Sequence, residues 1–315
     1  MDSLATIWPD LEEVAARNGV LRIAATSLGP GNVELFERWL AAGHHGTMRY
    51  LEKNAGVRRD PGARWPWARS AIVLTVAYEP ERPAAPPGSI ARHVARYALG
   101  DDYHEVLDRI LRELENSIAT AAPGTKTWRY VDTGPLSDRD LAAQAGLGWI
   151  GRNGMLIDPE HGSWTFIGLL LTSLEAPESV AEVADRCGEC TRCIDACPTE
   201  AILPGRVVDS NRCISHATIE VRGAIPDAVK DRLDGNIFGC DICQEVCPWN
   251  ATPAPSHPAF RARETYRATP VTDLLIATQE EFSALFRKSA IKRAKRTGMM
   301  RNAMLVTGAV PGSTD

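Results

Sequence analysis

The sequence has little that would place it in a membrane or on a secretory route. Its 315 residues contain no apolar run of 18 residues, the length typical of a membrane-spanning helix. The first twenty residues carry acids where a signal peptide would carry a positive region, and no apolar stretch follows them. The net charge of -5 argues against a globally basic nucleic-acid binder, although a local basic patch remains open. We therefore expect a cytoplasmic protein with no membrane association.

Cysteine is absent from residues 1–186, and all eight cysteines lie between Cys187 and Cys247. A composition shift of this kind suggests a separate metal-bearing module. Structural disulfides are rare in the cytoplasm, so eight thiols in that compartment are more typical of metal ligands than of crosslinks.

The thiols form two blocks with ferredoxin spacing. The first block has the pattern C-x2-C-x2-C-x3-C-P from Cys187 to Pro198, in which three close thiolates hold one cluster and the fourth ligates the other. The second block, from Cys240 to Pro248, repeats the later part of the pattern, and Cys213 is the only thiol left to complete it. The pattern predicts two [4Fe-4S] clusters, the first held by Cys187, Cys190, Cys193 and Cys247 and the second by Cys197, Cys213, Cys240 and Cys243.

Zinc is the main alternative, because paired C-x2-C units also build structural zinc sites. Zinc ribbons need two separated pairs, whereas this chain has three cysteines at two-residue gaps followed by C-x3-C-P. The spacing therefore favours iron–sulfur clusters over zinc, and disulfides are the weakest of the three interpretations.

Hydrophobic periodicity predicts alternating helices and strands before the cysteines. Helices are expected at 32–43, 102–121 and 137–147, and strands at 70–78, 125–133 and 163–173. This alternation indicates an α/β domain that extends to about residue 175. Proline-rich loops at 80–88 and 251–260 interrupt regular structure, and helical patterns return at 271–286 and 289–307.

No motif in the first domain identifies what receives the electrons. The chain has no P-loop, and it has no C-x3-C-x2-C run of the kind that binds the cluster of radical enzymes that cleave S-adenosylmethionine. The base-off cobalamin signature D-x-H-x-x-G is also absent. Residue chemistry alone therefore indicates a redox enzyme with two clusters and an unidentified cofactor or substrate.

Several longer motifs resemble those of the epoxyqueuosine reductases. They include "HGTMRYL" (45–51), "ARYALGDDYHEVL" (95–107) and "VDTGPLSDRDLAAQAGLGWIGRNGMLIDPEHGSWTFIG" (131–168). The cysteine blocks "CGECTRCIDACPTEAI", "RCISHATIE" and "GCDICQEVCPWN" follow in the family's order. The resemblance runs from about residue 20 to residue 305, and the family is related to cobalamin-dependent reductive dehalogenases.

The resemblance implies reduction of epoxyqueuosine to queuosine at the wobble position of tRNA. Cobalamin would bind base-off in an α/β domain (1–175), and a ferredoxin-like α+β module (176–252) would supply electrons from its two clusters. A short helical, HEAT-like tail (253–315) would contact the tRNA. Opening of the epoxide leaves an oxygen that must be protonated, and Asp132 occupies the position of the family's general acid. Without the flanking motif, Asp132 would be interpreted as a turn residue at a strand end.

Six further residues are candidate cofactor contacts by resemblance or by adjacency to the clusters. Each has a simpler alternative, such as a solvated charge, a helix cap, a turn or a packing role. They are Arg58, His104, Arg139, Asn153, Ser215 and Asp241.

A basic run between residues 287 and 301 contains no acid and resembles the family's tRNA-facing segment. The expected phosphate contacts are Lys288, Lys292, Arg293, Lys295, Arg296 and Arg301. The implied partners are the anticodon stem-loop that carries epoxyqueuosine and an external low-potential electron donor, with the chain acting as a monomer. The alternative is a dehalogenase-like cobalamin reductase of a small molecule, which would not need this basic run.

Overall fold

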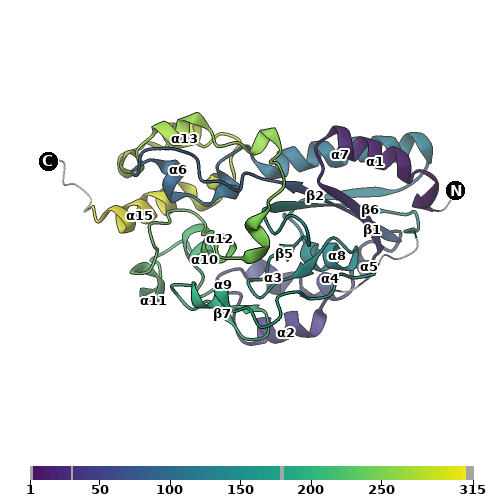
Figure 1. Ribbon diagram of the computed structural model, residues 1–315, viewed down its shortest axis with the longest axis horizontal. Helices are drawn as coiled ribbons and strands as arrows, with labels where there is room; N and C mark the ends of the chain where they lie inside the picture. Colours follow the sequence, from purple (N-terminus) through teal and green to yellow (C-terminus); the bar gives the residue numbers. More distant parts are fainter. Residues whose placement is uncertain (1–2, 30, 178–180, 310–315) are drawn as a thin grey trace.

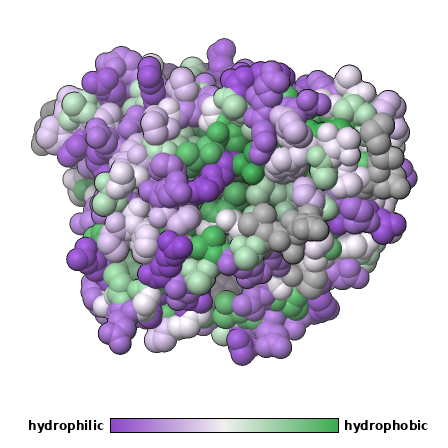
Figure 2. Space-filling view, turned by 45° about the vertical axis from the view of Figure 1, so that its right-hand side comes forward, coloured by the Kyte–Doolittle hydropathy of each residue, from purple (hydrophilic) through white to green (hydrophobic). Residues whose placement is uncertain are grey.

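The computed structural model describes residues 3–29, 31–177 and 181–309. A sheet with helices on both faces lies at one end, the cysteine module (residues 187–252) lies below and beside it, and the C-terminal helices cover the other end (Figure 1). Hydrophilic side chains surround a strip of apolar ones on the face seen in Figure 2. Within the described residues, no helix is long and apolar enough to cross a membrane.

The central sheet has four strands in the order β1-β2-β6-β3. Every neighbouring pair is antiparallel. The expected α/β domain was therefore wrong in one respect, because that class has a mainly parallel sheet and this domain is α+β. Alternation of helices and strands does not fix strand direction, since a connection that contains a helix can return the chain either way. The strands are β1 (Arg22–Ser27), β2 (Ser70–Ala77), β3 (Thr127–Tyr130) and β6 (Thr165–Thr172).

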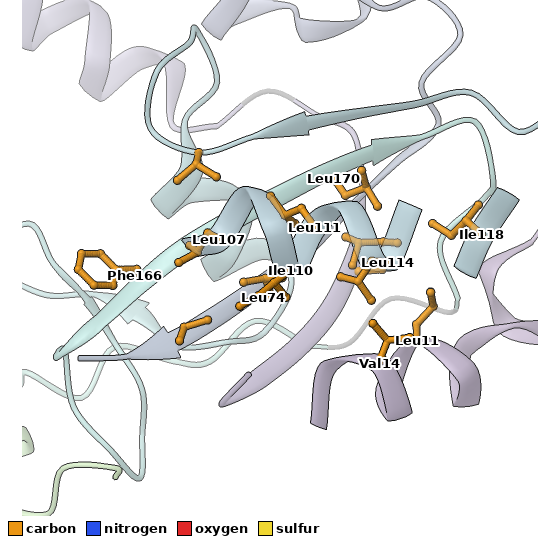
Figure 3. Close-up of a cluster of buried hydrophobic side chains, with 14 of the residues drawn as sticks. Leu11, Val14, Leu74, Leu107, Ile110, Leu111, Leu114, Ile118, Phe166 and Leu170 are labelled. Carbon is orange, nitrogen blue, oxygen red and sulfur yellow. The ribbon is translucent and has the colours of Figure 1, made fainter. Parts of the chain in front are cut away.

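Helices α1 (Trp8–Arg17) and α7 (Tyr103–Ala121) cover one face of this sheet (Figure 3). Helix α7 begins after Asp102, whose side chain caps the helix by accepting from the His104 amide at 3.1 Å. The apolar stripe predicted from the sequence is buried on the sheet, which confirms the helix and its orientation. Its members are Val106, Ile110, Leu111, Leu114 and Ile118.

The opposite face of the sheet packs against α8 (Asp138–Gln144) and the hairpin of β4 (Trp149–Ile150) and β5 (Leu156–Ile157). Gly146, Gly148 and Gly151 have the spacing of a G-x-G-x-x-G motif, but they lead from a helix into this hairpin. A dinucleotide-binding loop instead leads from a strand into a helix. Gly148 has φ 157°, and a Cβ there would lie 2.2 Å from the Ile157 carbonyl oxygen, so the hairpin requires glycine.

The remaining helices of the N-terminal region are short and lie along the segment before β2 or between β2 and α7. They are η1 (Leu4–Thr6), α2 (Val33–Ala41), α3 (Arg49–Lys53), α4 (Ala55–Arg59), α5 (Pro61–Arg64), α6 (Ile90–His93) and η2 (Arg96–Ala98).

The cysteine module consists of short elements, as expected for a segment whose backbone wraps around metal clusters. A small apolar cluster supports it, centred on Ile214, Val229 and Leu233. Its elements are α9 (Arg192–Asp195), β7 (Ile202–Leu203), β8 (Val207–Val208), α10 (Ile214–Ile219), α11 (Asp227–Lys230), α12 (Ile242–Glu245) and η3 (Pro248–Ala251).

The C-terminal segment (residues 258–309) is helical, but its helices are shorter than the sequence predicted. Lys295 has φ 64°, and this left-handed residue separates a short 3-10 helix from the last α-helix where one helix was expected. The segment shares an apolar core with Ile90, Leu99 and Phe238 from the preceding regions. Its elements are η4 (Pro258–Phe260), α13 (Glu264–Ala268), η5 (Val271–Leu275), α14 (Gln279–Leu285), η6 (Ala290–Ala294) and α15 (Lys295–Thr307).

The packing of α7 makes a direct prediction about stability. Leu114→Ala should lower the free energy of unfolding by about 2 to 5 kcal/mol, because it opens a cavity in a fully buried interface. Asn116→Ala, on the exposed side of the same helix, should change it by less than about 0.5 kcal/mol. Urea unfolding under anaerobic conditions, followed by tryptophan fluorescence, measures both, and equal losses would contradict the proposed orientation of α7.

Candidate iron–sulfur and catalytic site

Four thiols that are distant in sequence meet at one cavity. It is lined by Cys187, Cys190, Cys193 and Cys247, which are the four ligands expected for the first cluster. Arg152 and Arg192 line the same cavity, as does Trp249. The Trp149 indole N–H points to the Cys187 sulfur at 3.5 Å. The structure therefore brings the last cysteine of the second block to the first block.

The other four thiols form a second, more enclosed group. Burial, together with the neighbouring Cys213 and Cys197 thiols, raises the pKa of Cys240 to about 12. Burial also raises the pKa of Cys243 well above its usual value, with contributions from Cys240 and Cys213. Cys193 of the first group acts on Cys243 as well, which shows that the two groups adjoin.

The donors around these thiols fit iron–sulfur clusters. Backbone N–H groups point at the sulfurs, including that of Ala201 at 3.3 Å from Cys197 Sγ and that of Ile242 on Cys240. Such N–H···S contacts stabilise cluster thiolates and tune their reduction potentials. Among the described residues, no group of three or more His, Cys, Asp or Glu side chains is arranged to hold a single metal ion. The thiols surround a space rather than converging on one point.

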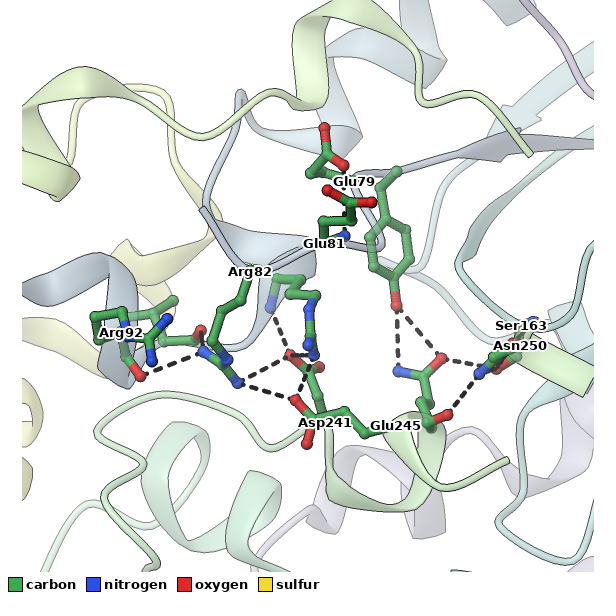
Figure 4. Close-up of polar contacts among 12 residues, drawn as sticks. Glu79, Glu81, Arg82, Arg92, Ser163, Asp241, Glu245 and Asn250 are labelled. Carbon is green, nitrogen blue, oxygen red and sulfur yellow. Dashed lines mark hydrogen bonds and ion pairs between the residues drawn. The ribbon is translucent and has the colours of Figure 1, made fainter. Parts of the chain in front are cut away.

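The loop between the second-group cysteines is fastened to the N-terminal region by a buried ion pair (Figure 4). Asp241 is 1% exposed and accepts from the Arg96 backbone N–H at 2.8 Å and from its guanidinium at 3.2 Å. The same guanidinium donates to Glu245 at 2.6 Å, and Arg82 lies 3.7 Å from Asp241. Burial raises the pKa of Asp241, while the two arginines oppose that shift.

A second buried network lies beside the first (Figure 4). The Gln244 side-chain amide donates to the Tyr78 hydroxyl at 3.2 Å, and the Gln244 carbonyl oxygen accepts from Ser163 at 2.9 Å. Asn250 donates to the Gln244 backbone carbonyl at 2.7 Å. Helix α12, which follows Cys240 and contains Cys243, is therefore held on both sides by residues at the end of β2 and the start of β6.

Asp132, the expected general acid, lies just beyond the end of β3 in a left-handed conformation with φ 50°. Its side chain is exposed, and the Tyr103 hydroxyl donates a hydrogen bond to Oδ2. The Tyr103 ring is itself fixed, because it stacks on Phe166 at 4.5 Å and on His104 at 4.0 Å between ring centroids. Burial and the Asp132 charge raise the pKa of Tyr103, so it remains a hydroxyl donor at neutral pH.

The charge of this carboxyl group acts on Tyr50 and Asp138 of the N-terminal region and on Arg293 of the C-terminal segment. Burial raises the pKa of Tyr50, and Glu220 and Asp132 raise it further. The Asp132 charge also contributes to the raised pKa of the half-buried Asp138, after burial itself. Tyr50 and Glu220 lie within the motifs HGTMRYL and RCISHATIE, but neither was predicted from the sequence as a site residue.

Three of the predicted cofactor contacts lie on the Asp132 side of the site. Arg58 donates to the Leu136 carbonyl at 2.8 Å, and its buried Nε atom has no hydrogen-bond partner among the described residues. Arg139 is exposed and donates to the Gly154 carbonyl at 2.8 Å. His104, the second residue of helix α7, pairs through Nδ1 with Asp102 at 2.7 Å.

The other predicted cofactor contacts lie at the thiols. Asn153 is buried and directs its amide N–H toward the Cys243 carbonyl at 3.5 Å. Ser215 hydrogen-bonds to the Cys213 thiol, whose pKa burial raises. Asn153 and Ser215 thus contact the backbone and a thiol of the cysteine module, whereas Asp241 pairs with Arg96 of the N-terminal region.

The predicted basic run divides into anchored and unpaired side chains. Arg301 donates to the carbonyls of Ala217 and Val221, and Arg296 donates to the carbonyl of Ala277. Arg293 holds Glu220 through two bonds of 2.9 Å, and Lys288 lies 3.5 Å from Glu105. Lys292 and Lys295 are exposed, and among the described residues neither side chain has a hydrogen bond or an ion pair.

Comparison with known proteins identifies the family. Residues 58–133 match the family model "Epoxyqueuosine reductase QueG, DUF1730", and residues 186–250 match "4Fe-4S double cluster binding domain". The epoxyqueuosine reductase of Gloeobacter violaceus is 39% identical over 277 residues, which cover 86% of this chain and 85% of the relative. The chain belongs to the epoxyqueuosine reductase family.

Solved structures agree with this assignment. A crystal structure of epoxyqueuosine reductase with an epoxyqueuosine-modified tRNA-Tyr stem loop matches with a TM-score of 0.88 at 30% identity, covering 96% of this chain and 81% of that one. A Bacillus subtilis epoxyqueuosine reductase, solved with its catalytic aspartate loop swung out of the active site, matches with a TM-score of 0.86 at 28% identity, covering 96% and 82%. The resemblance seen in the sequence is confirmed, and this epoxyqueuosine reductase is an oxidoreductase that acts in tRNA modification.

The two thiol groups predict how iron is lost from variants. Cys187→Ser and Cys247→Ser should each remove about half of the bound iron, and the double variant should lose no more, because both thiols belong to one group. Combining Cys247→Ser with Cys240→Ser should remove nearly all of it. Iron and sulfide analysis of anaerobically purified protein measures these losses.

Thr191→Ala is the matched control, because Thr191 is exposed within the first block and its side chain hydrogen-bonds to Asp195 rather than to a thiol. It should keep its full iron content. A Cys187–Cys247 double variant that loses twice as much iron as either single variant would assign the two thiols to different clusters.

Proposed function

We propose that this chain reduces epoxyqueuosine in tRNA to queuosine, with electrons that pass through two [4Fe-4S] clusters to base-off cobalamin. The observation that carries the proposal is that the exposed Asp132, which Tyr103 holds in place, lies on the same side of the molecule as the second thiol group. Burial raises the pKa of Tyr97, and both Asp132 and Asp241, the residue after Cys240, raise it further. Residues 1–175, 176–252 and 253–315 would form the cobalamin domain, the cluster module and the tRNA-binding tail.

The residues near Asp132 fit a large polar cofactor with amide side chains. Arg58 has a buried donor atom without a partner, and its guanidinium stands 5.5 Å from the Phe36 ring centroid. Arg58, Arg139 and His104 would hold the cofactor from the Asp132 side, and Asn153, Ser215 and Asp241 would act from the cluster side. Bound cobalamin would supply a strongly reducing centre for the epoxide carbon.

Asp132 would protonate the oxygen released when the epoxide opens. Its exposed side chain can take up a proton from water between turnovers, and the Tyr103 hydroxyl fixes the position of one carboxyl oxygen. In the Bacillus subtilis relative, a catalytic loop with an aspartate is swung out of the active site, which supports a catalytic aspartate on a movable loop. Asp132 also lies on a loop, which follows β3 directly.

The tRNA would bind on the side of the site that carries the C-terminal segment. The match to a structure solved with a modified tRNA stem loop supports an anticodon stem-loop as the partner. Of the six predicted contacts, Lys292 and Lys295 have the side chains most available to phosphates, whereas Arg296 and Arg301 bond to backbone carbonyls.

The proposed activity can be tested with anaerobically purified, cluster-loaded protein. A low-potential reductant and tRNA that carries epoxyqueuosine are supplied with or without cobalamin, and digested nucleosides are analysed by mass spectrometry. Loss of one oxygen only with cobalamin supports the proposal. No conversion by protein with intact clusters and verified cobalamin loading would instead favour a reductase of a small molecule.

Asp132→Asn should lower the rate of that conversion by about 10² to 10⁴-fold while iron and cobalamin contents stay normal. Asparagine tolerates the left-handed backbone, so only the acidic proton is lost. Asp234→Asn is a matched control, because Asp234 is also an exposed aspartate at positive φ, 49°. Near-normal turnover of Asp132→Asn would remove Asp132 from the acid role.

Lys292→Gln combined with Lys295→Gln should weaken tRNA binding and lower the slope of log K against log salt by about one to two, because two phosphate contacts are lost. Lys126→Gln, at an exposed position before β3, should leave both unchanged. Filter binding across a salt series measures affinity and slope together. An unchanged slope in the double variant would move the RNA site elsewhere.

A further inference from the structure

Tyr50 is exposed in a way that the fold does not require. It lies on helix α3 (Arg49–Lys53) and keeps 43% of its surface accessible. Only two other large hydrophobic residues in the described chain are exposed, Ile276 and Leu305. Single exposed apolar residues are common, so exposure alone assigns no role to Tyr50. Its surroundings are more informative.

The Arg293 guanidinium lies over the Tyr50 ring, 5.8 Å from the centroid, within cation–π range. Both carboxylate oxygens of Glu220 accept from Arg293 at 2.9 Å, and this bidentate contact fixes the guanidinium plane. Glu220 also compensates the charge of Arg293. Arg293 is therefore less suited to a phosphate than the sequence suggested, and better suited to presenting a flat surface.

This pair lies at the catalytic carboxyl group. Asp132 is close enough to raise the pKa of both Tyr50 and Arg293, in each case after larger effects, from burial for Tyr50 and from Glu220 for Arg293. The Arg293 side chain is 53% exposed, and that of Glu220 is 16% exposed. Two planar groups, each partly open to solvent, thus adjoin the exposed Asp132.

Unpaired positive charge continues from this pair along the chain. Lys292 directly precedes Arg293 on η6, and Lys295 follows two residues after Arg293. A flat aromatic and guanidinium surface beside free lysines is the combination that single-stranded nucleic acid requires, since bases stack while phosphates are neutralised. Splayed bases of RNA loops are bound in this way, on aromatic rings and arginine planes.

We propose that Tyr50 and Arg293 form a stacking platform for an unpaired RNA base next to the modified nucleotide, with Lys292 and Lys295 neutralising the adjoining phosphates. The platform rests on the proposed function, since it presupposes that the substrate is presented on RNA. Stacking holds the neighbouring base at the rim of the site, and the modified base then reaches Asp132.

The test uses cluster-loaded full-length protein and an anticodon stem-loop RNA with 2-aminopurine beside the modified position. Tyr50→Leu keeps apolar bulk but removes the ring, and it should weaken binding about tenfold or more without changing the salt slope. The same variant should lose the fluorescence quenching that stacking produces. Tyr50→Phe, which keeps the ring, should retain the wild-type affinity and quenching. Arg293→Lys should weaken binding because it replaces a planar group with a point charge.

Wild-type affinity and quenching in Tyr50→Leu would overturn the platform. So would a change in salt slope equal to that of the Lys292 and Lys295 variant, because the loss would then be electrostatic. A lower thermal midpoint with unchanged RNA affinity would reduce the Tyr50–Arg293 contact to a structural clasp. Conversion of epoxyqueuosine by the wild-type protein is measured alongside, so that failure of the platform is separable from failure of the proposed function.

Discussion

The buried Asp241–Arg96 pair is the contact on which the site's geometry depends. A carboxylate that is 1% exposed is stable only when it is paired and fully hydrogen-bonded, and Arg96 supplies both its backbone N–H and its guanidinium. Asp241 lies directly after Cys240 and two residues before Cys243, so the pair fixes the second thiol group against the N-terminal region. Removing either partner would leave a buried charge uncompensated. The position of the second thiol group against the N-terminal region is thus enforced by the cost of burying charge, together with the apolar core that Phe238 shares with Ile90 and Leu99.

Asp132, unlike Asp241, is held without burial and without an ion pair among the described residues. Its side chain is exposed, its backbone is left-handed and its visible anchor is the hydroxyl of Tyr103. The anchor is rigid, because its ring stacks on Phe166 within the sheet's aromatic cluster. A left-handed non-glycine residue stores local strain, which persists only when its surroundings over-determine it. A single hydrogen bond to a rigid ring allows the loop after β3 to position the Asp132 carboxyl group and still keep it in contact with solvent.

The sequence predicted the parts of this architecture that repeat or alternate. Cysteine spacing predicted that Cys247 joins the first block, and the cavity lined by those four thiols agrees with it. The stripe on α7 was also predictable, because burial on one face imposes a helical period. Strand direction was not, since an antiparallel sheet with helical connections has the same alternation as a parallel one. Tyr50 was missed for a different reason: a lone aromatic on a short helix has no pattern, and its significance comes from Arg293 and Glu220, which lie far away in sequence.

The basic run shows why charge in a sequence overstates charge on a surface. Arg296 and Arg301 bond to backbone carbonyls, and Arg293 is matched by Glu220, so only part of the run faces solvent unpaired. These internal contacts also attach the C-terminal segment to the rest of the protein. Those of Arg293 and Arg301 join the C-terminal segment to the cysteine module. Arg263 joins the same segment to Asp101 at 2.9 Å, just before α7 and Tyr103. Lys292 and Lys295 are thereby held at a fixed distance from Asp132. The arginines that bond within the protein thus determine where the unpaired lysines lie, and these lysines and the Asp132 carboxyl group belong to one packed unit.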